Sequence, residues 1–108
     1  MDNFIDKINT LVQTCDRLTH DILAEEPCTS LAGELCAGMA ALIKDIVELY
    51  SQPEYSVHVG DIPAWTDLAR RLIDACNGDD ILNLLDLVSY ELKYNLLELK
   101  SYVEGYES

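Results

Sequence analysis

Cysteine and histidine are the side chains of this sequence with the greatest capacity for chemistry, and their spacing argues against a metal site. Zinc is held in proteins by pairs of cysteine or histidine ligands that stand a few residues apart. The chain has four cysteines and two histidines, and none of them forms such a pair. These residues are Cys15, Cys28, Cys36, Cys76, His20 and His58. We therefore expect no metal ion and reduced thiols, with Cys15, Cys36 and Cys76 on or beside apolar helical stripes.

The sequence also lacks an evident acid–base pair for catalysis. Asp16 and His20 are four residues apart, so they share one face of a helix, where an ion pair in water is the common outcome. His20 and His58 follow Arg17 and Tyr55 at the offset where a di-iron bundle would place glutamate. Glycine-rich phosphate-binding motifs and the G-x-S-x-G nucleophile turn do not occur. The sequence therefore predicts a protein that is not an enzyme and that binds no cofactor.

The balance of charge is the strongest global property of the chain. Its 108 residues include 20 acidic and 7 basic side chains, which gives a net charge of −13 at pH 7. Such a field repels nucleic-acid phosphates and anionic lipid headgroups, so we expect neither a nucleic-acid partner nor a membrane partner. The acids are spread over the polar faces of all the expected helices, which favours solubility, with a basic partner as the alternative. The sequence begins without a signal-peptide pattern and has no apolar run of roughly 18 residues, so a cytoplasmic location is expected.

Apolar residues recur with the period of an α-helix in four segments of the chain. The expected helices cover residues of about 4–24, 29–50, 62–77 and 80–106. Short links force neighbouring helices to fold back on each other. We therefore predict a single all-α domain, residues 1–108, that forms an up-down-up-down four-helix bundle. A long loop, residues 51–63, would join the second and third helices.

The links between the helices carry recognisable turn signals. Pro27 breaks the pattern after the first helix because proline does not continue a helix. Asn77 and Gly78 both tolerate the left-handed backbone that closes a helix. Asp79 or Asp80 then caps the fourth helix through its side-chain oxygen.

Each of the first three expected helices has one apolar face that would form the core. These faces are Phe4, Ile8, Leu11, Cys15, Leu18 and Ile22; Ala32, Leu35, Met39, Leu42, Ile46 and Leu49; and Ile62, Trp65, Leu68, Ala69, Leu72, Ile73 and Cys76. The second helix also contains Gly33 and Gly38 among several alanines. Close packing against a neighbouring helix explains them better than a ligand does, since each glycine costs about 1 kcal/mol of helix stability relative to alanine.

The fourth expected helix carries apolar residues on two sides. The main stripe is Ile81, Leu84, Leu85, Val88, Leu92, Leu96, Leu99, Val103 and Tyr106. Asn95 also falls on this stripe, where we expect it to form a hydrogen bond at an edge or to face a helix neighbour, with a buried asparagine that sets the register as the alternative. The second stripe lies nearly opposite and consists of Leu87, Tyr90, Tyr94 and Leu97. Either the 51–63 loop covers this second stripe, or the stripe is an interface for a second copy of the chain or for another protein. Tyrosine suits such an interface because its ring packs while its hydroxyl stays in water.

The beginning of the fourth expected helix resembles a group of small bacterial helical proteins. Residues 79–92 read DDILNLLDLVSYEL, and the proteins of that group end in a D-x-L-x-Y-E-L pattern. The resemblance implies a bacterial source and a helical fold, and it brings no agreed activity. In size, acidity and helical content the chain is also similar to flagellar and type III export chaperones, which clasp secreted subunits.

Together these features favour a non-enzymatic protein–protein interaction module. Its partner would be another protein or a second copy of the chain, which leaves a homodimer open, and an export or assembly chaperone is the most concrete form. The alternatives are an acidic inhibitor or antitoxin-like binder of a basic target, and a structural protein. A small-molecule sensor would need polar groups that face inward, for which Asn95 and Thr19 are the candidates.

Overall fold

The chain folds into an all-α, four-helix arrangement, as the sequence predicts. The computed structural model describes residues 2–27, 29–51, 62–78 and 80–107. The first three helices are α1 (Asp2–Leu23), α2 (Thr29–Tyr50) and α3 (Ile62–Asn77). The fourth helix has three parts, which are α4 (Ile81–Asp86), the π-helical segment η2 (Leu87–Leu92) and α5 (Lys93–Glu107).

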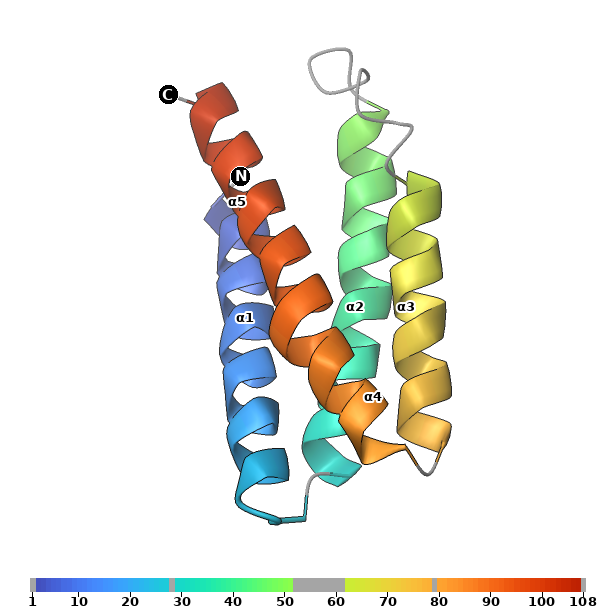
Figure 1. Ribbon diagram of the computed structural model, residues 1–108. Coiled ribbons are helices and arrows are strands. Elements are labelled where there is room, and N and C mark those ends of the chain that lie inside the picture. The colour runs from blue at the N-terminus through green and yellow to red at the C-terminus, as the bar shows by residue number, and fades with distance from the viewer. Residues whose placement is uncertain (1, 28, 52–61, 79, 108) are drawn as a thin grey trace.

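The last helix crosses the other three obliquely. Figure 1 shows α1, α2 and α3 along a common long axis, with the fourth helix running from the lower end of α3 toward the upper end of α1. The contacts agree with this path, since α4 and η2 pack against α3, whereas η2 and α5 pack against α1. The result is an elongated molecule of 44 × 23 × 19 Å.

Helix α1 ends in a C-terminal capping motif that was not predicted from the sequence. Glu25 has a positive φ of 58°, a left-handed conformation that is uncommon for a residue other than glycine. The Glu26 amide donates to the Asp21 carbonyl oxygen at 2.8 Å, and the Glu25 amide donates to the Ile22 carbonyl oxygen at 3.1 Å. This pair of bonds is the Schellman motif, which satisfies the last carbonyls of a helix. Pro27 then follows, as expected.

The turn between α3 and α4 is closed by hydrogen bonds rather than by left-handed backbone. The Gly78 amide donates to the Asp74 carbonyl oxygen at 3.0 Å, and the Asp80 side chain accepts from the Asn83 amide at 3.1 Å. Asp80 is therefore the cap of the fourth helix, which confirms one of the two expected candidates. The expectation of left-handed backbone at Asn77 and Gly78 is wrong, because Glu25 is the only described residue with a positive φ.

The expected apolar faces of the first three helices form most of the core. Their buried members are Phe4, Ile8, Leu11, Cys15, Leu18, Ala32, Leu35, Met39, Leu42, Ile46, Leu49, Trp65, Leu68 and Leu72. Two expected core residues are misplaced, since Ile73 of α3 and Ile81 of α4 keep 47% and 46% of their surface exposed. Both side chains line a pocket beside the turn that joins α3 to α4.

The fourth helix keeps its apolar side chains on the core by means of one wider turn. Leu84, Val88, Leu92 and Leu96 are all buried, and they follow one another at three successive steps of four residues. In an α-helix each such step overshoots a full turn by about 40°, so the stripe would rotate about 120° away from the core by Leu96. The π-helical segment η2 has more residues per turn and removes this drift.

The same turn corrects two expectations about the fourth helix. It is not one uninterrupted α-helix from about residue 80 to 106, because η2 divides it. Leu87, expected in the second stripe, is buried with 5% of its surface exposed. Leu87 lies three residues after Leu84, so the two side chains share one face of the helix, and η2 keeps this face on the core for the rest of the helix.

Some expectations concern residues outside the described ranges. These are Cys28, the 52–61 part of the expected loop with His58, Asp79 as a helix cap, and the side chain of Tyr106. Within the described part of the chain, no helix combines the length and the hydropathy that a bilayer span requires.

The two glycines of α2 that the sequence analysis singled out have different surroundings. A Cβ atom on Gly38 would overlap the side chain of Leu11, which reaches across from α1. A Cβ atom on Gly33 would meet no atom within 4 Å. Close packing therefore accounts for Gly38 alone.

We predict opposite outcomes for alanine at these two positions. Gly33→Ala should raise the free energy of unfolding by roughly 0.5–1 kcal/mol, because alanine favours the helix and the added methyl group meets nothing. In Gly38→Ala the displaced Leu11 side chain should offset that gain or reverse it. Urea denaturation of both variants checks this, and equal stabilisation by both would contradict the close packing of α1 on Gly38.

Candidate functional site

The outer side of the fourth helix exposes two tyrosines and a leucine. Tyr90 and Tyr94 keep 63% and 62% of their surface exposed, and Leu97 keeps 38%. These three residues of the expected second stripe lie three or four positions apart, so they share one face, which we call the tyrosine face. Leu87 does not belong to it. Leu82, near the start of the same helix, is also exposed.

Two ion pairs link the helix that carries the tyrosine face to its neighbours. Arg71 of α3 donates to the Glu91 carboxylate in η2, and this hydrogen bond raises the pKa of the guanidinium. On the other side, Lys93 Nζ lies 2.7 Å from Asp16 Oδ1 of α1, and its hydrogen bond to this carboxylate raises the pKa of Lys93. The helix is thus tied to both neighbours near its π turn, with Tyr90 and Tyr94 directed outward between the two ties.

The edge of the tyrosine face is polar and acidic. Asp86, Glu91 and Glu98 are exposed on the same helix, as is Asn95. Asn95 is exposed, and its Nδ2 donates to the Glu91 carbonyl oxygen at 2.7 Å, which agrees with the expected hydrogen bond at an edge of the main stripe. A partner of this face would therefore meet aromatic rings in the middle and negative charge at the edge.

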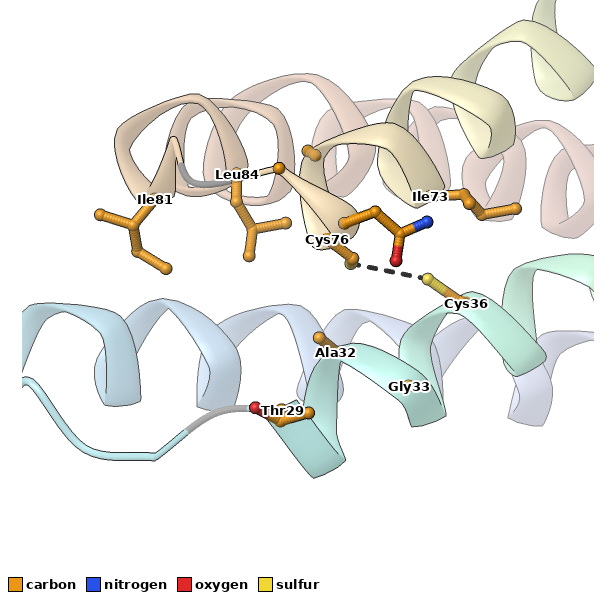
Figure 2. Close-up of a pocket in the computed structure, with 11 residues that line it drawn as sticks. Thr29, Ala32, Gly33, Cys36, Ile73, Cys76, Ile81 and Leu84 are labelled. Atoms are coloured by element: carbon orange, nitrogen blue, oxygen red, sulfur yellow. Dashed lines mark hydrogen bonds between the residues drawn. The ribbon is translucent and has the colours of Figure 1, made fainter.

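A pocket of about 450 Å³ lies at the other end of the same helix, where α2, α3 and α4 meet. Figure 2 shows its mostly apolar wall and two thiols that point toward each other, Cys36 from α2 and Cys76 from α3. Their Sγ atoms are 3.6 Å apart. The wall consists of Thr29, Ala32, Gly33, Cys36, Ile73, Ala75, Cys76, Asn77, Gly78, Ile81 and Leu84. The spacing of apolar residues predicts both cysteines on or beside apolar stripes. It does not predict that they lie close together, because 40 residues separate them in the chain.

The third described cysteine, Cys15, has a thiol of low reactivity. Cys15 is fully buried in the core, and burial together with the charge of Asp16 raises the pKa of its thiol from 9.0 to about 12, against the opposing charge of Lys93. A thiol is nucleophilic only as the thiolate, so Cys15 is a poor nucleophile at neutral pH.

The expected Asp16–His20 pair does not form. The exposed His20 ring lies 3.6 Å from Asp21 through Nδ1, while Asp16 pairs with Lys93. Among the described residues, no three side chains of histidine, cysteine, aspartate or glutamate gather as they would around a metal ion.

Comparison of the chain with protein-family models, with curated proteins and with solved structures gives no match. The resemblance of residues 79–92 to small bacterial helical proteins therefore stays a prediction. Function has to be inferred from the surfaces of the chain itself, which are the tyrosine face and the pocket with its two thiols.

The buried Cys15 thiol generates a prediction about stability at alkaline pH. Burial raises the pKa of the Cys15 thiol in the folded protein, so between pH 9 and pH 12 this thiol ionises in the unfolded chain but not in the folded one. Its contribution to the free energy of unfolding is therefore complete below pH 9 and is lost as the pH rises toward 12. The free energy of unfolding of the wild type, relative to Cys15→Ala, should fall by about 1.4 kcal/mol between pH 8 and pH 10. Urea denaturation of both proteins across this range measures the difference. Parallel pH profiles would show that Cys15 is accessible to solvent.

Proposed function

We propose that the protein is a non-enzymatic protein–protein interaction module that binds its partner through the tyrosine face. The observation that carries this proposal is the exposure of Tyr90, Tyr94 and Leu97 in one row on the outer side of the fourth helix. Tyrosine is enriched at protein interfaces because a large, rigid ring is buried at a small cost in side-chain entropy. A helical segment of the partner that lies along this row would bury both rings.

The charge of the chain supports a protein partner over other macromolecules. At a net charge of −13, nucleic acids and anionic membranes are repelled. Asp86 and Glu98 at the edge of the tyrosine face favour a partner whose apolar stripe is bordered by lysine or arginine. The same charges oppose the docking of a second copy of the chain, so we prefer a different protein to a homodimer.

In biological terms the proposal is a cytoplasmic bacterial protein that acts as an export or assembly chaperone. Such a chaperone would hold an amphipathic segment of its client on the tyrosine face. The second candidate function is an acidic inhibitor or antitoxin-like protein that covers a basic target, which the exposed carboxylates favour. Ionic strength separates the two, because screening weakens charge-driven binding steeply and leaves apolar docking nearly unchanged.

The test uses the partner recovered from source cells with the wild-type chain as bait. We predict that Tyr90→Ala/Tyr94→Ala weakens its binding at least tenfold while the melting temperature stays within a few degrees of the wild type, because both rings are exposed in the free protein. The matched control is Leu23→Ala/Val47→Ala, which removes exposed apolar side chains from α1 and α2. Calorimetric titration at low and at high salt gives the affinities.

Three results bear on the outcome. Equal loss of affinity in the two double variants would contradict a specific role for the tyrosine face. A change above tenfold between low and high salt, with no effect of the tyrosine variant, would support the acidic inhibitor instead. If the wild type alone doubles its mass in sedimentation and the tyrosine variant does not, the partner is a second copy of the chain.

A further inference from the structure

We propose that Cys36 and Cys76 are a site of reversible oxidation, where hydrogen peroxide converts the two thiols into a disulfide that joins α2 to α3. This inference is independent of the tyrosine face. It rests on two thiols that lie together across a helix interface beside an open pocket.

The short distance between the sulfur atoms of Cys36 and Cys76 favours a disulfide between these two residues. The Sγ atoms lie 3.6 Å apart, in contact but not bonded, whereas a disulfide needs about 2.0 Å. An approach of about 1.6 Å is within the range of side-chain rotation and small helix shifts. Cys15 is excluded from this chemistry by its full burial in the core.

The surroundings of the pair allow the movement that the bond requires. Cys76 lies in the last turn of α3, one residue before its end at Asn77. Helix ends open more readily than helix centres, so this turn can adjust. On the facing helix Gly33 leaves space beside Cys36, and the pocket of about 450 Å³ lies next to both thiols. The pair therefore has room to close.

The pocket also gives a small oxidant access to the sulfurs. Both cysteines are only half-buried and form part of the pocket wall in Figure 2. Hydrogen peroxide is uncharged, so the net charge of −13 does not repel it, whereas anionic disulfides such as oxidised glutathione are repelled. A structural zinc ion would need four ligands, and among the described residues no three side chains of histidine, cysteine, aspartate or glutamate gather around one point.

The reaction proceeds in two steps that balance. The thiolate of one cysteine attacks the peroxide, so its sulfur becomes a sulfenic acid and hydroxide leaves, to be protonated to water. The second thiol then attacks this sulfur, the S–S bond forms, and the sulfenic oxygen departs as a second water with the thiol proton. One peroxide is thus reduced to two waters while two thiols are oxidised. In a reducing cytoplasm, thiol exchange with an uncharged dithiol restores the pair.

The experiment treats the reduced, full-length protein with hydrogen peroxide and maps its peptides without reduction. We expect a single cross-link between the peptides of Cys36 and Cys76, removed by dithiothreitol. Because the bond closes a loop of 40 residues, the melting temperature should rise by about 10–17 °C. Cys28→Ser is the matched control and should form the same cross-link with the same rise.

Single variants complete the test. In Cys36→Ser and in Cys76→Ser the remaining thiol should stop at the sulfenic acid, which dimedone traps, and the melting temperature should not rise. The proposal is overturned if peroxide links Cys28 to either residue in preference, or oxidises Cys36 or Cys76 to sulfinic acid in the wild type without a cross-link. The wild-type peptide map decides the matter even if a serine variant fails to fold.

Discussion

Four apolar side chains at steps of four residues have to reach one core from a single helix, and this requirement shapes the rest of the molecule. Leu84, Val88, Leu92 and Leu96 meet it because the π-helical segment η2 widens one turn. A regular α-helix would carry the last of them about a third of a turn away from the core. With the wider turn, the helix leaves α3, crosses the bundle and continues along α1 (Figure 1), where Leu99 and Val103 are still buried.

The surfaces proposed to function follow from this one adjustment. Since the core side does not rotate, the outer side does not rotate either, and Tyr90, Tyr94 and Leu97 stay in one exposed row. Arg71 and Lys93, which belong to a small set of basic residues, are placed where they tie the π turn to α3 and α1. At the beginning of the same helix, Ile81 and Leu84 complete the pocket beside Cys36 and Cys76. π turns are rare and often occur at functional sites, which agrees with this placement.

The helices and most of the core were predictable because each face repeats with a single period that the sequence carries in full. All six expected core residues of α2, for example, are buried. The register of the fourth helix was not predictable from a constant 100° per residue, although the repeated steps of four before Leu96 were a visible signal of a wider turn. Leu87 was misplaced for that reason. The Cys36–Cys76 pair was missed for a different one, since a contact across 40 residues depends on how two helices pack and not on local spacing.

The side of the helix on which Leu87 lies tests this account most directly, because the structure buries Leu87 at the core, whereas the two stripes expected from the sequence place it in solvent with Tyr90, Tyr94 and Leu97. Urea denaturation of Leu87→Ala, with Leu97→Ala as the matched control on the same helix, measures the difference. The account predicts a loss of about 2–4 kcal/mol in the free energy of unfolding for Leu87→Ala and less than about 1 kcal/mol for Leu97→Ala. Equal, small losses in the two variants would contradict the burial of Leu87 and the helix register that defines the tyrosine face.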